Sequence, residues 1–114
     1  MHRGVKDYSE ITTKDEKFII LRHDIEFSPK RAYDLAVVEA KYGICSTFFF
    51  QISNNAYNIF SEKNKERIME IMSMGHKVGL HFHRQGSNDL EEIKQRIQFE
   101  SDVMSHIFHM IFVL

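Results

Sequence analysis

The stretch FIILRHDIEFSP, residues 18–29, decides how the whole chain is interpreted. An apolar run, FIIL, is followed by the polar-rich run RHDIE and then by Ser-Pro, a pair typical of a helix start. The apolar run predicts a strand over residues 17–23 that is covered on both faces. In α/β proteins, side chains that follow such a strand and precede a helix lie where ligands bind. Asp24 and Glu26 are therefore the first candidates for a functional site.

The same pattern recurs twice further along the chain. Strands are predicted for CSTFFFQI, residues 45–52, and for HKVGLHFH, residues 76–83, because both are rich in β-branched, aromatic or alternating apolar residues. Helical spacing predicts helices over three ranges: 29–42, 62–74 and 89–104. The alternation indicates an α/β fold of about three β-α units, with parallel strands joined by right-handed crossovers and helices outside.

Composition excludes several classes of protein. The chain has 114 residues, enough for one small domain, with 43% hydrophobic and 27% charged residues and a formal net charge of −1. That charge gives no basic surface for nucleic acid, and no segment approaches the ~20 apolar residues of a membrane span. The polar N-terminus lacks a signal peptide, so a cytoplasmic location is predicted. The single cysteine, Cys45, is predicted to be a buried thiol rather than a reactive nucleophile.

His81 and His83 are two residues apart on the third predicted strand. They therefore point to the same face, with Cα atoms about 6.5 Å apart. Two imidazoles at this spacing, with a carboxylate from a neighbouring strand, can hold Zn²⁺ or a similar ion. The alternative is two exposed histidines at a strand end. Asp24 and Glu26 have the same spacing, and their alternative role is to place negative charge near a helix N-terminus.

The carboxylate pair Asp24 and Glu26 and the imidazole pair His81 and His83 predict a metal site more strongly together than either pair does alone. If the first and third strands are near neighbours in a parallel sheet, the carboxylates and imidazoles meet at one edge. One carboxylate can then ligate a metal while another takes a proton from bound water, which suits hydrolysis of an amide or ester. His23 alternates away from Asp24 and is predicted to make a structural hydrogen bond. His76 follows a helix end, where the helix dipole favours a cation.

Three segments carry a family resemblance: LRHDIEFSPKRAYDLAVVEAKYGICSTFFFQI, YNIFSEKN and IMSMGHKVGLHF. Together they resemble the polysaccharide deacetylases with a NodB homology domain, the family 4 carbohydrate esterases. The chain is similar in particular to the branch found with bacterial surface-polysaccharide genes, with its patterns RHD-V-D, G-I-x-x-T-(Y/F)-F and G-H-E-I-G-L-H. The match covers residues 17–100 in consistent order. The resemblance implies a distorted (β/α) barrel that removes N- or O-acetyl groups from polysaccharides with a divalent metal, often zinc.

The resemblance also implies roles for individual residues. Asp24 falls on the catalytic base. The metal-binding acid falls on Glu26, or on Asp24 itself, because the spacing here is D-x-E rather than two adjacent aspartates. His81 matches the first metal-binding histidine. The second would stand four residues later, where this chain has Gln85, and His83 is the candidate to replace it.

The sequence is thus divided into a polar lead-in (1–16), a partial NodB-like domain (17–104) and an apolar tail (105–114) that is interpreted as truncation-related. The family's later motifs have no counterpart here: an arginine, a tryptophan–aspartate pair and a final catalytic histidine. The predicted function is a metal-dependent deacetylase of N-acetylated sugars, as an incomplete fragment with little or no activity. The alternative is a non-catalytic fragment that binds carbohydrate or a partner. Self-association is predicted through an exposed sheet edge and the uncovered tail.

Overall fold

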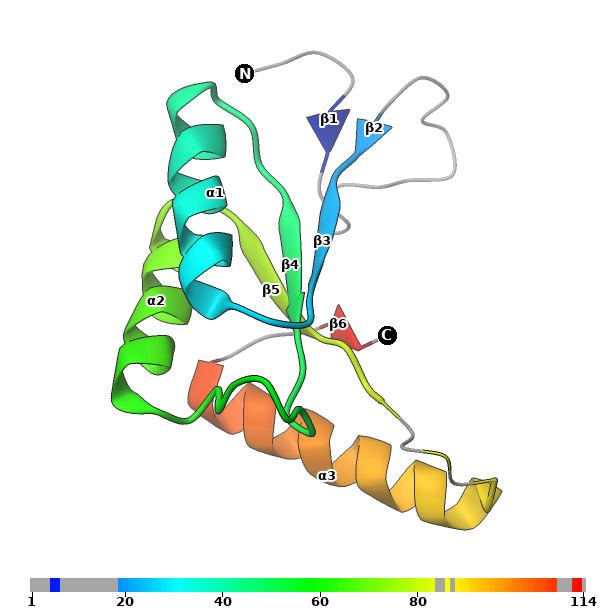
Figure 1. Ribbon diagram of the computed structural model, residues 1–114. Coiled ribbons are helices and arrows are strands. Elements are labelled where there is room, and N and C mark those ends of the chain that lie inside the picture. Colours follow the sequence, from blue (N-terminus) through cyan, green and yellow to red (C-terminus); the bar gives the residue numbers. More distant parts are fainter. Residues whose placement is uncertain (1–4, 7–18, 84–85, 87, 109–111, 114) are drawn as a thin grey trace.

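The computed structural model describes residues 5–6, 19–83, 86, 88–108 and 112–113 (Figure 1). Most of the predicted lead-in, part of the predicted tail and Gln85 lie outside the described residues. No helix in the described part is both long and apolar enough to cross a membrane.

The fold is α/β, built on four parallel strands that are neighbours in chain order. These are β3 (Arg22–Ile25), β4 (Thr47–Phe50), β5 (Lys77–Leu80) and β6 (Phe112–Val113). Two further short strands, β1 (Val5–Lys6) and β2 (Ile19–Ile20), form a separate parallel pair. The prediction that the first three β-α units have adjacent parallel strands is confirmed.

The helices begin and end where local chemistry dictates. α1 (Pro29–Lys41) follows Ser28, whose hydroxyl accepts from the Arg31 N–H at 3.2 Å, and α2 (Glu62–Ser73) is capped in the same way by Ser61. Gly75, just after α2, has a φ of 100°, a conformation that favours glycine.

The third helix, α3 (Leu90–Phe108), is preceded by Asp89, which caps it. The Asp89 carboxylate accepts from the Glu91 and Glu92 N–H groups at 3.0 and 3.4 Å. An aspartate suits this position because its oxygen bonds the first free N–H groups and its negative charge is favoured at a helix N-terminus.

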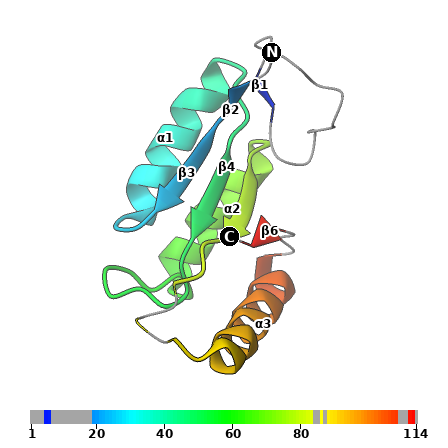
Figure 2. The ribbon, with the colours of Figure 1, turned by 90° about the vertical axis from the view of Figure 1, so that its right-hand side faces the viewer.

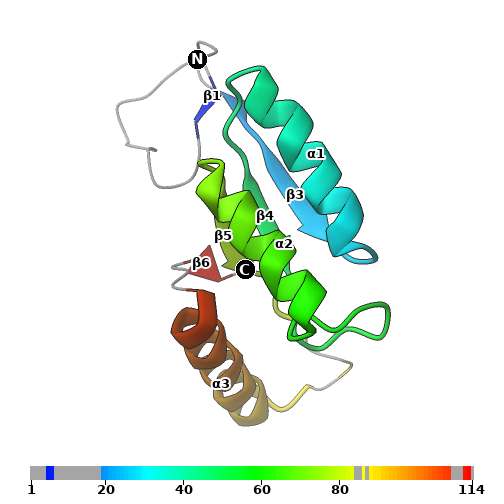
Figure 3. The same cartoon turned by 90° about the vertical axis from the view of Figure 1, so that its left-hand side faces the viewer.

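One face of the sheet is covered by α1 and α2, which lie in front of the strands in Figure 3. Side chains alternate along each strand, so every second residue points into this layer. Together with residues of α3, these side chains form one hydrophobic core: Ile25, Ala32, Ala36, Phe48, Phe50, Ile59, Ile68, Ile71, Val78, Leu80, Met104 and Phe108. The opposite face of the sheet, seen in Figure 2, carries the alternate residues of each strand.

α3 lies apart from the other two helices, beside the carboxyl ends of the strands (Figure 1). Its buried residues are Glu100, Met104 and Phe108, four apart and hence on one stripe. Met104 and Phe108 belong to the core, whereas Glu100 lies one turn nearer the strand ends. The helix therefore brings a buried carboxylate to the end of the sheet where ligands bind in parallel α/β proteins.

Three sequence expectations were wrong. The first strand continues to Ile25, because it pairs along β4, so Asp24 lies in the strand rather than after it. The helix predicted to run towards 104 or beyond continues to Phe108, which is buried in the core rather than uncovered as predicted for the tail, and Phe112–Val113 then pairs with β5. Cys45 is exposed because it lies in the turn before β4, one residue ahead of the buried stretch.

Candidate functional site

Asp24 and His81 lie on the same face of the sheet, opposite α1 and α2. Asp24 is in register with Phe49 on β4, which is in register with Gly79 on β5, and His81 follows two residues later. Residues in register, or two apart on a strand, point to the same face. One strand separates the two strands, so Asp24 and His81 are about 10 Å apart across the sheet and about 7 Å apart along it.

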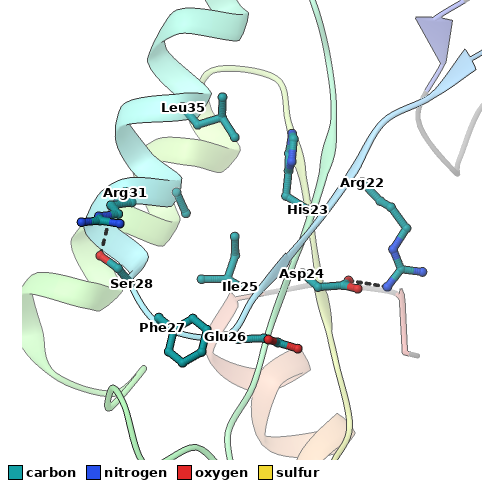
Figure 4. Close-up of a pocket in the computed structure, with 10 residues that line it drawn as sticks. Arg22, His23, Asp24, Ile25, Glu26, Phe27, Ser28, Arg31 and Leu35 are labelled. Atoms are coloured by element: carbon teal, nitrogen blue, oxygen red, sulfur yellow. Dashed lines mark hydrogen bonds and ion pairs between the residues drawn. The ribbon is translucent and has the colours of Figure 1, made fainter.

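Asp24 forms an ion pair with Arg22, two residues earlier on the same face. The Arg22 guanidinium also lies over the Phe49 ring, 4.6 Å from its centre. Figure 4 shows Arg22, Asp24 and Glu26 on one side of β3. His23 and Ile25 lie on the other side, towards α1. The Asp24 carboxylate is exposed at the edge of a hollow of about 430 Å³ between β3 and α1. It is thus accessible, and Arg22 fixes its position.

His81 presents an unusual ring nitrogen. Its backbone N–H donates to the Phe50 carbonyl at 2.8 Å, which continues the strand pairing. Its ring Nδ1 is buried and has no hydrogen-bond partner among the described residues. Most buried polar atoms have a partner, so such an atom needs an explanation, and a bound metal or ligand is one. His83 is exposed, and its carbonyl accepts from the Arg96 guanidinium at 3.0 Å.

Gln51 lies between the two parts of the candidate site. Continuing the register past Phe50 places it level with Glu26 on one side and His81 on the other. The Asn54 amide donates to the Glu26 carbonyl at 2.9 Å and to Gln51 Oε1 at 2.5 Å. The chain after β3 is thereby joined to the chain after β4.

Tyr57 makes a second link between these two strand ends. Its hydroxyl accepts from the Gln51 N–H at 2.8 Å and donates to the Ile25 carbonyl at 2.5 Å. Burial raises the pKa of Tyr57 to about 12. The phenol therefore stays protonated and keeps donating its hydrogen bond well above neutral pH.

Glu100 and Ser53 are residues that sequence reasoning missed. The Ser53 hydroxyl donates to Glu100 Oε2 at 2.8 Å, and Glu100 is only 4% exposed. Oε1 of the same carboxylate is buried, and no group in the part of the chain that the structure describes forms a hydrogen bond with it. The available signal was a charged residue on the stripe of α3 that otherwise holds Met104 and Phe108. A carboxylate on a buried stripe is rarely placed there without a partner or a role.

A different polar network lies on the helix-covered face. Glu39 of α1 is bonded through Oε2 to His23 Nε2 and through Oε1 to the Ser46 hydroxyl, both at 2.7 Å. The structural hydrogen bond predicted for His23 is confirmed. Both oxygens of this buried carboxylate are thus satisfied, and the network ties β3 to α1 and to the turn before β4.

His76 extends this network and corrects its predicted role. It is buried, not an exposed cation at a helix end. The Ser46 N–H donates to Nδ1 at 3.1 Å, so Nε2 carries the proton and donates to the Ala36 carbonyl at 2.9 Å. Accepting a hydrogen bond at Nδ1 requires a neutral ring. The helix-dipole argument failed because tertiary packing placed two backbone partners around the imidazole.

The structure brings the predicted residues to one face and one end of the sheet, but it assembles no complete metal centre from them. Within the described residues, no three His, Cys, Asp or Glu side chains gather closely enough to hold an ion. Asp24, Glu26 and His83 are exposed and His81 is half-buried. The set of metal ligands predicted from the sequence therefore stays a prediction.

Comparison with known proteins adds no family assignment. No protein-family model matches the chain, and a search of curated proteins found no significant match. Arguments about function therefore depend on the residues themselves and on the motifs described above.

Proposed function

We propose that this chain carries the first half of a metal-dependent deacetylase site of the polysaccharide deacetylase type. The observation that carries the proposal is the register: Asp24 and His81 share a face at the carboxyl end of a parallel sheet. The NodB-type distorted barrel is part of the same proposal. It is compatible with strands that follow one another in chain order, with α1 and α2 on one face.

The donor types at this end of the sheet fit a zinc ion. Among the described residues the buried Nδ1 of His81 has no hydrogen-bond partner, and Glu26 and His83 offer an exposed carboxylate and an exposed imidazole just after the ends of β3 and β5. When bound, a divalent metal would polarise the acetyl carbonyl of an N-acetylated sugar. Asp24 would take the proton from the attacking water, and Arg22 holds its carboxylate on the correct face.

Metal binding is the experiment that tests this proposal. Zinc titration by calorimetry is expected to show one site in the wild type, weakened at least tenfold by His81→Ala. His106→Ala is the matched control, because His106 is an exposed histidine on α3, outside the candidate site. Equal zinc affinity in all three proteins would overturn the proposal.

A further inference from the structure

One flank of α1 presents a row of apolar side chains to solvent. Leu35, Val38 and Tyr42 are 39%, 50% and 65% exposed, and Arg31, one turn before Leu35, is exposed as well. These four residues, here called the α1 stripe, are four, three and four positions apart, so they lie in one row along the helix. Single exposed apolar residues are ordinary, whereas a continuous row of them indicates a contact surface.

The α1 stripe lies at an outer edge of the described fold. The flank of α1 that faces α2 carries other residues, namely Lys30, Tyr33 and Asp34. Arg31 and Leu35 instead line the hollow of about 430 Å³ between α1 and β3 (Figure 4). β3 is the outermost strand on this side of the four-stranded sheet. A second molecule can therefore approach the stripe without displacing a described helix or strand.

The spacing of the α1 stripe is the same when the helix is read in either direction. Intervals of four, three and four positions are symmetric about the midpoint of the row. Two copies of α1 packed antiparallel about a two-fold axis at this midpoint therefore place Leu35 of each copy against Val38 of the other. The same operation places each Arg31 guanidinium against the Tyr42 ring of the other copy, a favourable pairing of a cation with an aromatic face. A two-fold interface requires this kind of self-complementary surface.

The charges beside the α1 stripe are complementary in the same arrangement. Asp34 and Lys41 lie on one side of the row, and antiparallel packing brings Asp34 of each copy within about one turn of Lys41 of the other. Asp34 is paired with Lys30 in its own chain, but that ion pair is exposed, so the carboxylate remains accessible to a second cation. A parallel arrangement would instead place Arg31 beside Arg31 and Asp34 beside Asp34. Like charges thus disfavour the parallel alternative.

We infer that α1 docks antiparallel against α1 of a second copy of this chain, through the α1 stripe, to form a two-fold dimer. The helix has only 13 residues, so the contact is smaller than the about 1,200–2,000 Å² of a standard protein–protein interface. The dimer should therefore be weak and should form reversibly as the protein concentration rises. This inference needs no metal and does not depend on the proposed function.

Sedimentation equilibrium of the full chain, over about a hundredfold range of concentration, tests the inference. The expected result is a reversible equilibrium between monomer and dimer, with the dissociation constant raised at least tenfold by Val38→Lys. Met69→Lys is the matched control, because Met69 is 54% exposed on the neighbouring helix α2 and the substitution adds the same charge outside the α1 stripe. Circular dichroism checks that both variants fold.

A compensating pair of substitutions tests the antiparallel arrangement. Arg31→Glu is expected to weaken the dimer, and adding Tyr42→Lys to the same chain is expected to recover part of the loss, because the new opposite charges face each other across the two-fold axis. Within one chain the two positions are about 16 Å apart along the helix and cannot form an ion pair. A monomer at every concentration, equal effects of Val38→Lys and Met69→Lys, or no recovery in the double variant would each overturn the inference.

Discussion

The two buried carboxylates of Glu39 and Glu100 lie at opposite ends of the sheet and differ in how completely they are hydrogen-bonded. Glu39, on the helix-covered face, has both oxygens bonded, to His23 and to Ser46. Glu100, at the carboxyl ends of the strands, has one oxygen bonded to Ser53 and one that has no partner within the described ranges of the chain. A satisfied network is typical of a structural role, because it costs little to bury and much to disrupt. An unsatisfied group is the kind of feature that a ligand completes.

The same contrast holds for the histidines. His76 uses both ring nitrogens within the fold, one accepting from Ser46 and one donating to Ala36. His81, on the other face, has a buried ring nitrogen that forms no hydrogen bond with any described residue. The comparison teaches that the Glu39 and His76 side chains on the helix-covered face have their hydrogen bonds satisfied within the fold, whereas His81 and Glu100 at the strand ends still have bonding capacity.

Replacing each carboxylate by methionine is the strongest test of this comparison. Glu39→Met should lower the free energy of unfolding by about 2–4 kcal/mol, because it leaves the buried Ser46 hydroxyl and the His23 ring without their partner. Glu100→Met should change it by less than about 1 kcal/mol, because the lost Ser53 bond is offset by removing an unsatisfied oxygen. Urea unfolding followed by circular dichroism measures both. Similar losses in the two variants would remove the distinction drawn here.

Tyr57 lies at the same strand ends as Glu100, but its hydroxyl both accepts and donates a hydrogen bond, so it extends the comparison. Tyr57→Phe should lower the free energy of unfolding by about 1–2 kcal/mol, since the Gln51 N–H and the Ile25 carbonyl lose a shared partner.

The raised pKa of Tyr57 makes the stability of the protein depend on pH. The folded protein holds the phenolic proton more tightly than the unfolded chain, whose tyrosine pKa is about 10. This contribution to stability is complete below pH 10 and is lost as the pH rises towards 12.

The pH dependence of Tyr57 is measured by urea unfolding at several pH values from 8 to about 11.5. The wild type should lose stability faster than Tyr57→Phe across the upper part of that range. Tyr42→Phe is the control, because Tyr42 is largely exposed and makes no bond to a strand end. Parallel curves for the wild type and Tyr57→Phe would contradict the assignment of a buried, protonated phenol.

Replacing Arg22 should have a smaller effect on stability than replacing Glu39 or Tyr57, because its ion pair with Asp24 is exposed to water. Arg22→Met is expected to cost no more than about 1 kcal/mol, the sum of a weak surface ion pair and a weak contact with the Phe49 ring. Arg31→Met, on the exposed face of α1, is the matched variant. A loss well above 2 kcal/mol would mean that the opposite face has a structural network of its own.

The sequence determined the order, direction and approximate limits of the first three β-α units. Ser28, Ser61 and the turn glycines act within a few residues of their own position, so local chemistry is enough to locate α1 and α2. Alternation within a strand likewise places His81 on the face away from Leu80. The candidate residues Asp24 and His81 could be chosen on this basis, because strand ends are where parallel sheets place ligand groups.

Tertiary structure alone decided which polar groups are satisfied. The bonds of Glu39 to His23 and of Ser53 to Glu100 join residues 16 and 47 positions apart, and no local pattern specifies such a pairing. His76 was misinterpreted for the same reason, since its partners come from α1 and from the turn before β4. The pairing of Phe112–Val113 with β5 depends on where α3 returns the chain. Hydrogen bonds between distant segments are selected by packing, and packing is a property of the assembled fold.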